Sequence, residues 1–208
     1  MAKAQDSDPI RSVKDIVVRP IATRVTSEEM ELRKRVMDFV VAARKPYPVN
    51  GDPDEKALIS LARRDVLRID EEDGVVCVYP VSAYETNKKV IFEDGRYGYA
   101  MCALDAIGFH YAFGEDVVIE GECEYCGSRI VVSVSGGKAR VLEGGDVYVT
   151  HTDLEKRKNW SCCCCNAMHF FDCKGNLERW QAETQASGET FPVSLETANK
   201  IAWLLFSP

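Results

Sequence analysis

The sequence lacks an apolar run long enough to cross a lipid bilayer, and its first eight residues contain no apolar segment typical of a secretion signal. It also lacks a basic block, because 26 lysines and arginines are interspersed with 33 acidic residues, which gives a net charge of -7. Proteins that bind a phosphate backbone usually carry a basic patch. We therefore expect a cytoplasmic protein that binds neither a membrane nor nucleic acid.

Cysteine, in contrast, is abundant. The chain has nine cysteines, an odd number, and in a reducing compartment they are expected to be free thiols rather than a disulfide framework. Four of them are consecutive, at positions 162–165, and Cys102, Cys123 and Cys126 lie upstream. Thiolate is a soft ligand that prefers soft metals. The sequence therefore predicts a soft-metal site or thiol chemistry.

The patterns predict an α+β protein in three parts: a flexible arm over residues 1–25, a winged-helix-like helical module over 26–83, and a core over 84–208. In the module, Thr26 and Glu29 have the spacing of a capping box at the start of a helix. A second helix is expected over residues 54–65, followed by a hairpin of strands at 66–69 and 75–81.

In the core we expect small mixed or antiparallel sheets with short helices. The predicted elements are a strand at 89–92, a helix over about 97–109, strands near 117–120 and 130–134, and a C-terminal helix over 195–205. Ser194 is placed to cap that last helix.

Cys102 and Asp105 are three residues apart, so on a helix their side chains share a face. Near a helix start the dipole favours the thiolate form of a cysteine. Apolar neighbours should raise the pKa of Asp105, so that it can donate a proton near neutral pH. The alternative is that Cys102 is a small buried hydrophobic residue and Asp105 makes a local hydrogen bond.

These residues belong to a longer pattern that resembles the organomercurial (alkylmercury) lyase family over residues 84–172. The pattern consists of Tyr84-Glu85-Thr86 before a strand, Cys102-Ala103-Leu104-Asp105, Cys123 at a strand end, and Cys165 before His169-Phe170-Phe171.

The resemblance implies that Cys102 and Cys165 are the two thiolates that bind mercury, and that Asp105 is the acid that protonates the departing carbon. The products would be a hydrocarbon and thiolate-bound Hg(II), and no organic cofactor would be required. The implied partners are the organomercurial substrate, small thiols and a mercuric reductase.

Two departures from the family pattern leave alternatives open. Asn166 follows Cys165, where the family commonly has a second cysteine, so Cys164 would replace Cys165 if the strand register shifts by one residue. In addition, Cys123 and Cys126 together form a Cys-x-x-Cys-Gly motif, where the family has a single cysteine.

The Cys-x-x-Cys-Gly motif suggests a structural zinc site. Cys123 and Cys126 with Cys162 and Cys165 supply four thiolates in the style of a zinc ribbon. Alternatively, Cys123 and Cys126 bind zinc with Cys162 or Cys163 while Cys165 stays catalytic, or Cys123 is a buried structural cysteine near the active site, as the resemblance implies. The rival function is a non-catalytic protein that binds zinc, copper or mercury through these thiols, and a third is a lyase acting on another carbon–metal or carbon–sulfur bond.

The remaining candidates are assigned structural roles. His169 is expected to be a core histidine with satisfied hydrogen bonds rather than a metal ligand. Cys77 and Cys173 are expected to be packing residues, although Cys173 is close enough in sequence to the cysteine run to act as a relay thiol.

Overall fold

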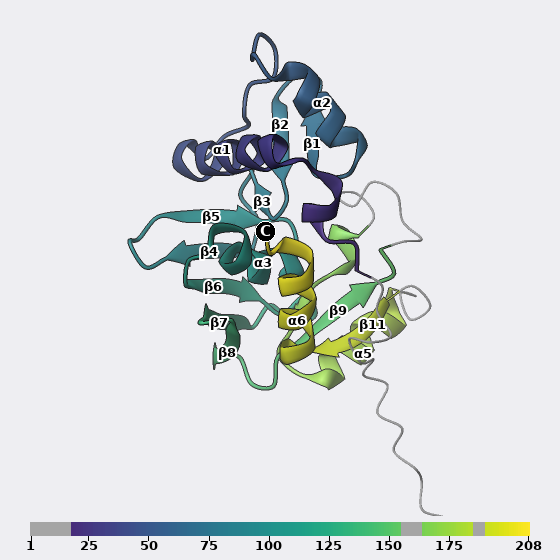
Figure 1. Ribbon diagram of the computed structural model, residues 1–208. Helices are drawn as coiled ribbons and strands as arrows, with labels where there is room; N and C mark the ends of the chain where they lie inside the picture. Colours follow the sequence, from purple (N-terminus) through teal and green to yellow (C-terminus); the bar gives the residue numbers. More distant parts are fainter. Residues whose placement is uncertain (1–17, 155–163, 185–189) are drawn as a thin grey trace, which may run out of the picture.

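A computed structural model describes residues 18–154, 164–184 and 190–208 (Figure 1). The longer helices are α1 (Ser27–Ala43), α2 (Glu55–Arg63), α3 (Ala103–Phe113), α5 (Lys174–Glu183) and α6 (Leu195–Phe206). Two short 3-10 helices are η2 (Ile21–Arg24) and η3 (Cys165–Ala167).

The strands form two antiparallel sheets. An eight-stranded sheet has the order β1-β2-β3-β5-β4-β6-β7-β8, and a three-stranded sheet has the order β10-β9-β11. The larger sheet contains β1 (Leu67–Asp70), β2 (Gly74–Val78), β3 (Val81–Ser82), β4 (Lys89–Phe92), β5 (Tyr97–Ala100), β6 (Val117–Glu122), β7 (Arg129–Ser135) and β8 (Lys138–Glu143). The smaller contains β9 (Tyr148–Thr152), β10 (Phe170–Phe171) and β11 (Thr190–Ser194). The expected α+β class with antiparallel sheets is confirmed.

The start of α1 confirms the capping box. The Glu29 amide donates to the Thr26 hydroxyl at 3.2 Å, and the Thr26 amide donates to the Glu29 carboxylate at 2.9 Å. Each bond satisfies an amide that the first turn of a helix leaves without a partner. The helix ends at Ala43, and its C-cap residue Arg44 adopts a left-handed conformation shortly before Pro46. The predicted hairpin that follows α2 is also present as β1 and β2, whereas the winged-helix-like arrangement stays a prediction.

The prediction of one helix over residues 97–109 was wrong in its first turn. Residues 97–100 form β5, which pairs with β4 across the Asp94-Gly95 turn, and α3 begins only at Ala103. Alternating burial explains why residues 97–100 form a strand rather than a helical turn, because Gly98 and Ala100 are buried while Tyr97 and Tyr99 are half-buried. That period of two fits a strand that has one buried face. Cys102 therefore lies at the junction of a strand and a helix.

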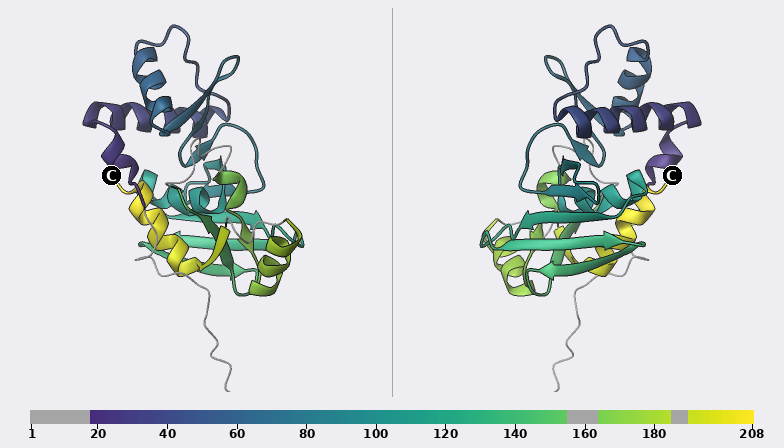
Figure 2. Two further views of the ribbon diagram at one scale, coloured as in Figure 1. Left: turned by 90° about the vertical axis from the view of Figure 1, so that its right-hand side faces the viewer. Right: turned by 90° about the vertical axis from the view of Figure 1, so that its left-hand side faces the viewer.

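Helices α3 and α6 pack together, and α3 also contacts β4, β5, β6 and β7 of the larger sheet (Figures 1 and 2). Gly108 permits the close approach of the two helices, since a Cβ atom there would lie only 2.3 Å from Cδ2 of Phe206. The amide of Thr197 donates to the hydroxyl of Ser194, as predicted for the cap of α6. Because α6 also contacts β9 and β11, it connects the two sheets.

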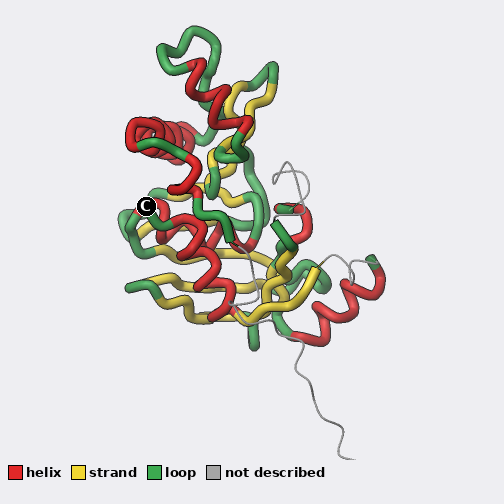
Figure 3. Tube along the Cα trace, turned by 45° about the vertical axis from the view of Figure 1, so that its right-hand side comes forward, coloured by secondary structure: helices red, strands yellow, loops and turns green. Residues whose placement is uncertain are grey.

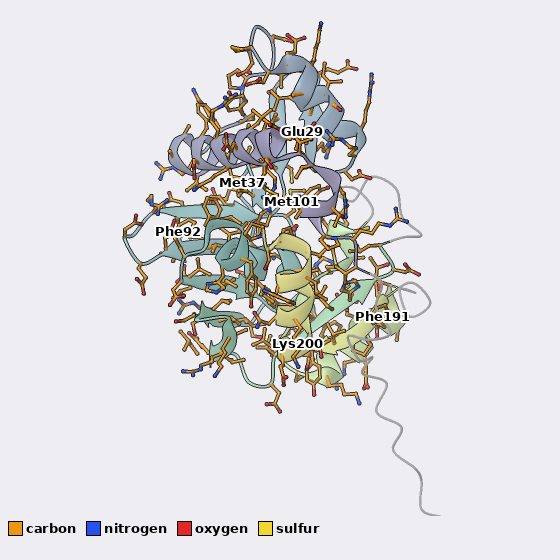
Figure 4. All side chains as sticks on the ribbon, viewed as in Figure 1. Glu29, Met37, Phe92, Met101, Phe191 and Lys200 are labelled. Atoms are coloured by element: carbon orange, nitrogen blue, oxygen red, sulfur yellow. The ribbon has the colours of Figure 1, made fainter. Side chains whose placement is uncertain are left out.

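The core is a single cluster of buried apolar side chains that extends from η2 and α1 through α3 to α6. Figure 3 shows α1 nearly end-on above the stacked strands, and Figure 4 labels Met37 on the side of α1 that faces the sheet. Within the described residues, no helix combines the length and the apolarity that a membrane span requires.

Candidate active site

Cys102 occupies the N-cap of α3. Its backbone is extended, and its sulfur accepts a hydrogen bond from the Asp105 amide at 3.3 Å, which is the role that a serine or threonine oxygen usually plays. The thiol is fully buried. A sulfur in this position faces the amide groups and the positive end of the helix dipole, and both stabilise a thiolate.

Asp105 lies in the first turn of α3 and is 4% exposed. The Cys102 thiol donates to its Oδ2 atom at 3.0 Å, so the pair predicted from the sequence is in contact. Burial raises the pKa of Asp105 from 3.8 to about 6, although the hydrogen bonds from the two nearby thiols act in the opposite direction. A carboxyl with this pKa holds its proton far more often near neutral pH than an exposed aspartate does.

Cys165 begins η3, about sixty residues downstream, and it completes the cluster. Its thiol lies 3.5 Å from the same Oδ2 atom of Asp105, and ligand atoms of Cys102, Asp105 and Cys165 all lie within 4.8 Å of one another. The Ala103 amide donates to the Met168 carbonyl at 3.0 Å, which joins the start of α3 to the segment that follows η3. Cys164 is also buried but is not part of this group among the described residues.

Both thiols have a raised pKa. Burial raises the pKa of Cys102, while its contact with Cys165 lowers it. For Cys165 that same contact, followed by burial and the Asp105 charge, raises the pKa well above its ordinary value. The pKa of both thiols is thus raised, and the position of Cys102 at the start of α3 is the feature that favours its thiolate.

Cys77 and Lys88 are two nearby groups that the sequence did not identify as part of this site. Cys77, on β2, is buried, and after desolvation the charges of Asp105 and Cys102 are the next causes that raise its pKa. Lys88, just before β4, is 5% exposed and its charge lowers the pKa of Asp105. No motif singles out either residue, because each is brought close by the order of strands in the sheet.

A second group of thiols lies at the end of β6. Ligand atoms of Cys123, Cys126 and Asp172 lie within 4.8 Å of one another. Sequence reasoning missed Asp172, although it directly follows the His169-Phe170-Phe171 segment. Cys162, the expected third zinc ligand, lies outside the described residues.

His169 makes two polar contacts. Its Nε2 atom lies 2.8 Å from the Asn166 carbonyl, and its Nδ1 atom lies 2.9 Å from a carboxylate oxygen of Glu124. The expectation that His169 is a core histidine rather than a metal ligand stays a prediction. Cys173, at the start of α5, is exposed.

Comparisons with known proteins give a consistent result. The alkylmercury lyase family model matches residues 81–207. An alkylmercury lyase of Staphylococcus epidermidis is 27% identical over 158 residues, which cover 73% of this chain and 72% of that protein. One from Bacillus cereus is 28% identical over 134 residues, covering 62% of this chain and 59% of the relative.

The fold agrees as well. The crystal structure of the mercury-bound form of MerB2 superposes with a TM-score of 0.70 at 18% sequence identity, covering 88% of this chain and 91% of that one. The family model spans more than half of the chain and includes Cys102, Asp105 and Cys165. The chain therefore belongs to the alkylmercury lyase family.

Proposed function

We propose that this protein is an organomercurial lyase that cleaves the carbon–mercury bond by protonolysis. In this proposal Cys102 and Cys165 bind the mercury atom, and Asp105 donates the proton to carbon. The observation that carries the proposal is the convergence of two thiols and one carboxyl from remote parts of the chain, within 4.8 Å and almost fully buried. Family membership supports the same substrate class.

Cys102 is the first ligand in this mechanism. The Asp105 amide and the start of α3 stabilise its thiolate, which displaces the counter-ligand X of R–Hg–X, and one proton leaves with X as HX. The second thiol, Cys165, then binds the same mercury atom and loses its proton. Asp105 is the nearby acceptor, since its Oδ2 atom lies 3.5 Å from the Cys165 sulfur.

Two thiolates that donate electron density to mercury weaken the carbon–mercury bond, and negative charge builds on carbon. Protonated Asp105 then transfers its proton to that carbon. The balanced reaction is R–Hg–X plus two thiols giving R–H, HX and mercury bound by two thiolates. The raised pKa of Asp105 suits both steps, because the group can accept a proton from a thiol and release it to a far more basic carbon.

In this scheme the protein's own side chains perform the reaction without an organic cofactor. The bound Hg(II) product is passed to small thiols or to a mercuric reductase, which are the proposed partners. We also propose a cytoplasmic location, without a nucleic-acid or membrane partner. A reducing compartment suits Cys77, Cys102, Cys123, Cys126, Cys165 and Cys173, which are all reduced thiols.

The test is release of benzene from phenylmercury by the purified, fully reduced protein with excess small thiol. The expected result is many turnovers per protein, with loss of turnover in Cys102→Ser and Cys165→Ser. Cys173→Ser is the matched control, since this exposed thiol is not part of the cluster. Tight binding of mercury without benzene release would instead support the non-catalytic metal-binding protein.

A further inference from the structure

The loop between β6 and β7 forms a compact turn around Cys123. The Cys123 amide donates to the Ser128 carbonyl at 2.8 Å, and the Gly127 amide donates to the Cys123 carbonyl at 2.8 Å. Gly127 has a φ of +71°, a conformation that favours glycine. This Cys-x-x-Cys-Gly turn brings the sulfurs of Cys123 and Cys126 to the same side of the loop, where both contact Asp172.

Asp172 provides the third donor. Its Oδ1 atom lies 3.3 Å from the sulfur of Cys123, and its Oδ2 atom lies 3.4 Å from the sulfur of Cys126. Two further side chains orient the carboxylate: the Ser128 hydroxyl donates to Oδ2 at 2.8 Å, and the Asn176 amide donates to Oδ1 at 2.7 Å. An outer shell of this kind is what fixes the carboxylate ligands of metal sites.

The charges of the cluster match a divalent ion. In the metal-free form one carboxylate accepts hydrogen bonds from two thiols, so the three groups carry about one negative charge in total. A divalent ion that replaces the two thiol protons leaves that total unchanged, because the ligands then carry three negative charges and the ion two positive ones. The exchange releases two protons and requires no other reactant.

We propose that Cys123, Cys126 and Asp172 bind one divalent ion of the zinc type, with water at the fourth position. Two thiolates and one carboxylate are a donor set that zinc accepts in tetrahedral geometry. Exposure of Cys126 leaves one side open to solvent, as the fourth position requires. This site uses Asp172 where the sequence suggested Cys162, and it shares no residue with the proposed active site.

The position of the site indicates its role. Its ligands come from the β6–β7 loop and from the segment between β10 and α5, and the Glu124 amide donates to the Phe170 carbonyl at 2.9 Å between the same two segments. Strand β10 closely follows η3, which carries Cys165. A metal ion here would link the β6–β7 loop to the segment after β10, so it would stabilise this part of the fold.

The test is a titration of the full-length, reduced, metal-free protein with Co²⁺, followed by displacement with Zn²⁺. We expect one equivalent of Co²⁺ to give a thiolate-to-cobalt charge-transfer band, which Zn²⁺ removes. The zinc-bound protein should also have a higher melting temperature than the metal-free protein. The Cys126→Ser and Asp172→Ala variants should lose the band or bind far more weakly. Asn176→Ala, which removes an outer partner, should weaken binding by about 10–100-fold.

Two matched controls separate this site from the other thiols. Cys173→Ser alters the neighbouring exposed cysteine, and the Cys102→Ser/Cys165→Ser double variant removes the proposed catalytic thiols; both should keep the band. The proposal is overturned if the wild-type protein gives no band, if the band survives in Cys126→Ser, or if it depends on Cys162 and not on Asp172. Because Cys126 is exposed, its replacement should leave the fold intact, which circular dichroism checks.

Discussion

Replacing Asp105 with asparagine should separate the catalytic role of this side chain from its cost to the fold. Asparagine has the same shape and keeps an oxygen that can accept the hydrogen bond from the Cys102 thiol, but it cannot donate an acidic proton to carbon. General acid catalysis typically contributes about 10²–10⁴-fold to a rate. We therefore expect benzene release from phenylmercury to fall by roughly that factor, while the protein still binds mercury through its two thiols.

The same substitution should stabilise the protein at alkaline pH. Burial raises the pKa of Asp105 from 3.8 to about 6, so the folded state holds a proton that the unfolded state releases between these values. The protonated Asp105 carboxyl therefore makes its full contribution to the stability of the folded protein below about pH 4. This contribution is lost as pH rises through about 6. A difference of roughly two pKa units corresponds to about 3 kcal/mol.

The assay is urea unfolding of wild-type and Asp105→Asn protein at several pH values. We expect the free energy of unfolding of the variant to exceed that of the wild type by up to about 3 kcal/mol above pH 7, and the difference to close toward pH 4. A variant that turns over phenylmercury at the wild-type rate would refute the role of Asp105 as proton donor. A variant that is less stable at every pH would refute the account of its burial.

Three further predictions concern the second thiol, the first helix and the packing of the last one. Cys165→Ser should abolish turnover, because its sulfur lies 3.5 Å from the Asp105 carboxyl in the Cys102–Asp105–Cys165 group, whereas Cys164→Ser should retain most of it. Steady-state benzene release measures both variants, and the reverse pattern would move the site to Cys164. Thr26→Ala removes the N-cap of α1 and should lower the free energy of unfolding by about 1 kcal/mol without changing turnover. Chemical denaturation measures the first effect and benzene release the second. Gly108→Val should cost about 1–3 kcal/mol, since the added side chain meets the ring of Phe206, and an unchanged melting temperature would contradict this packing.

Local sequence signals predicted the parts of the fold that depend on neighbouring residues. The capping box at Thr26 and the cap at Ser194 both form, because side chains three residues apart satisfy the same amides in any context. The Tyr97-Gly98-Tyr99-Ala100 segment was misassigned since its apolar residues fit a buried helix as well as a strand. Its pairing with β3 and β4, together with its alternating burial, distinguishes the two.

The candidate site shows the same division. Cys102 and Asp105 could be paired from their spacing alone. Cys165 was added because the longer pattern of residues resembles that of the alkylmercury lyase family. Cys77, Lys88 and Asp172 could not be found in this way. Each comes close to a thiol or to Asp105 through strand order or through a crossing of remote segments, and a single sequence carries no local signal for such contacts.

A crystal structure of the reduced, full-length protein after reaction with one equivalent of phenylmercury tests the central proposal most directly. We predict one mercury atom bound by the sulfurs of Cys102 and Cys165, with the Asp105 carboxyl beside it and no phenyl group attached. Mercury bound at Cys123 and Cys126, or at Cys102 together with Cys164 while Cys165 stays unbound, would contradict the proposed active site.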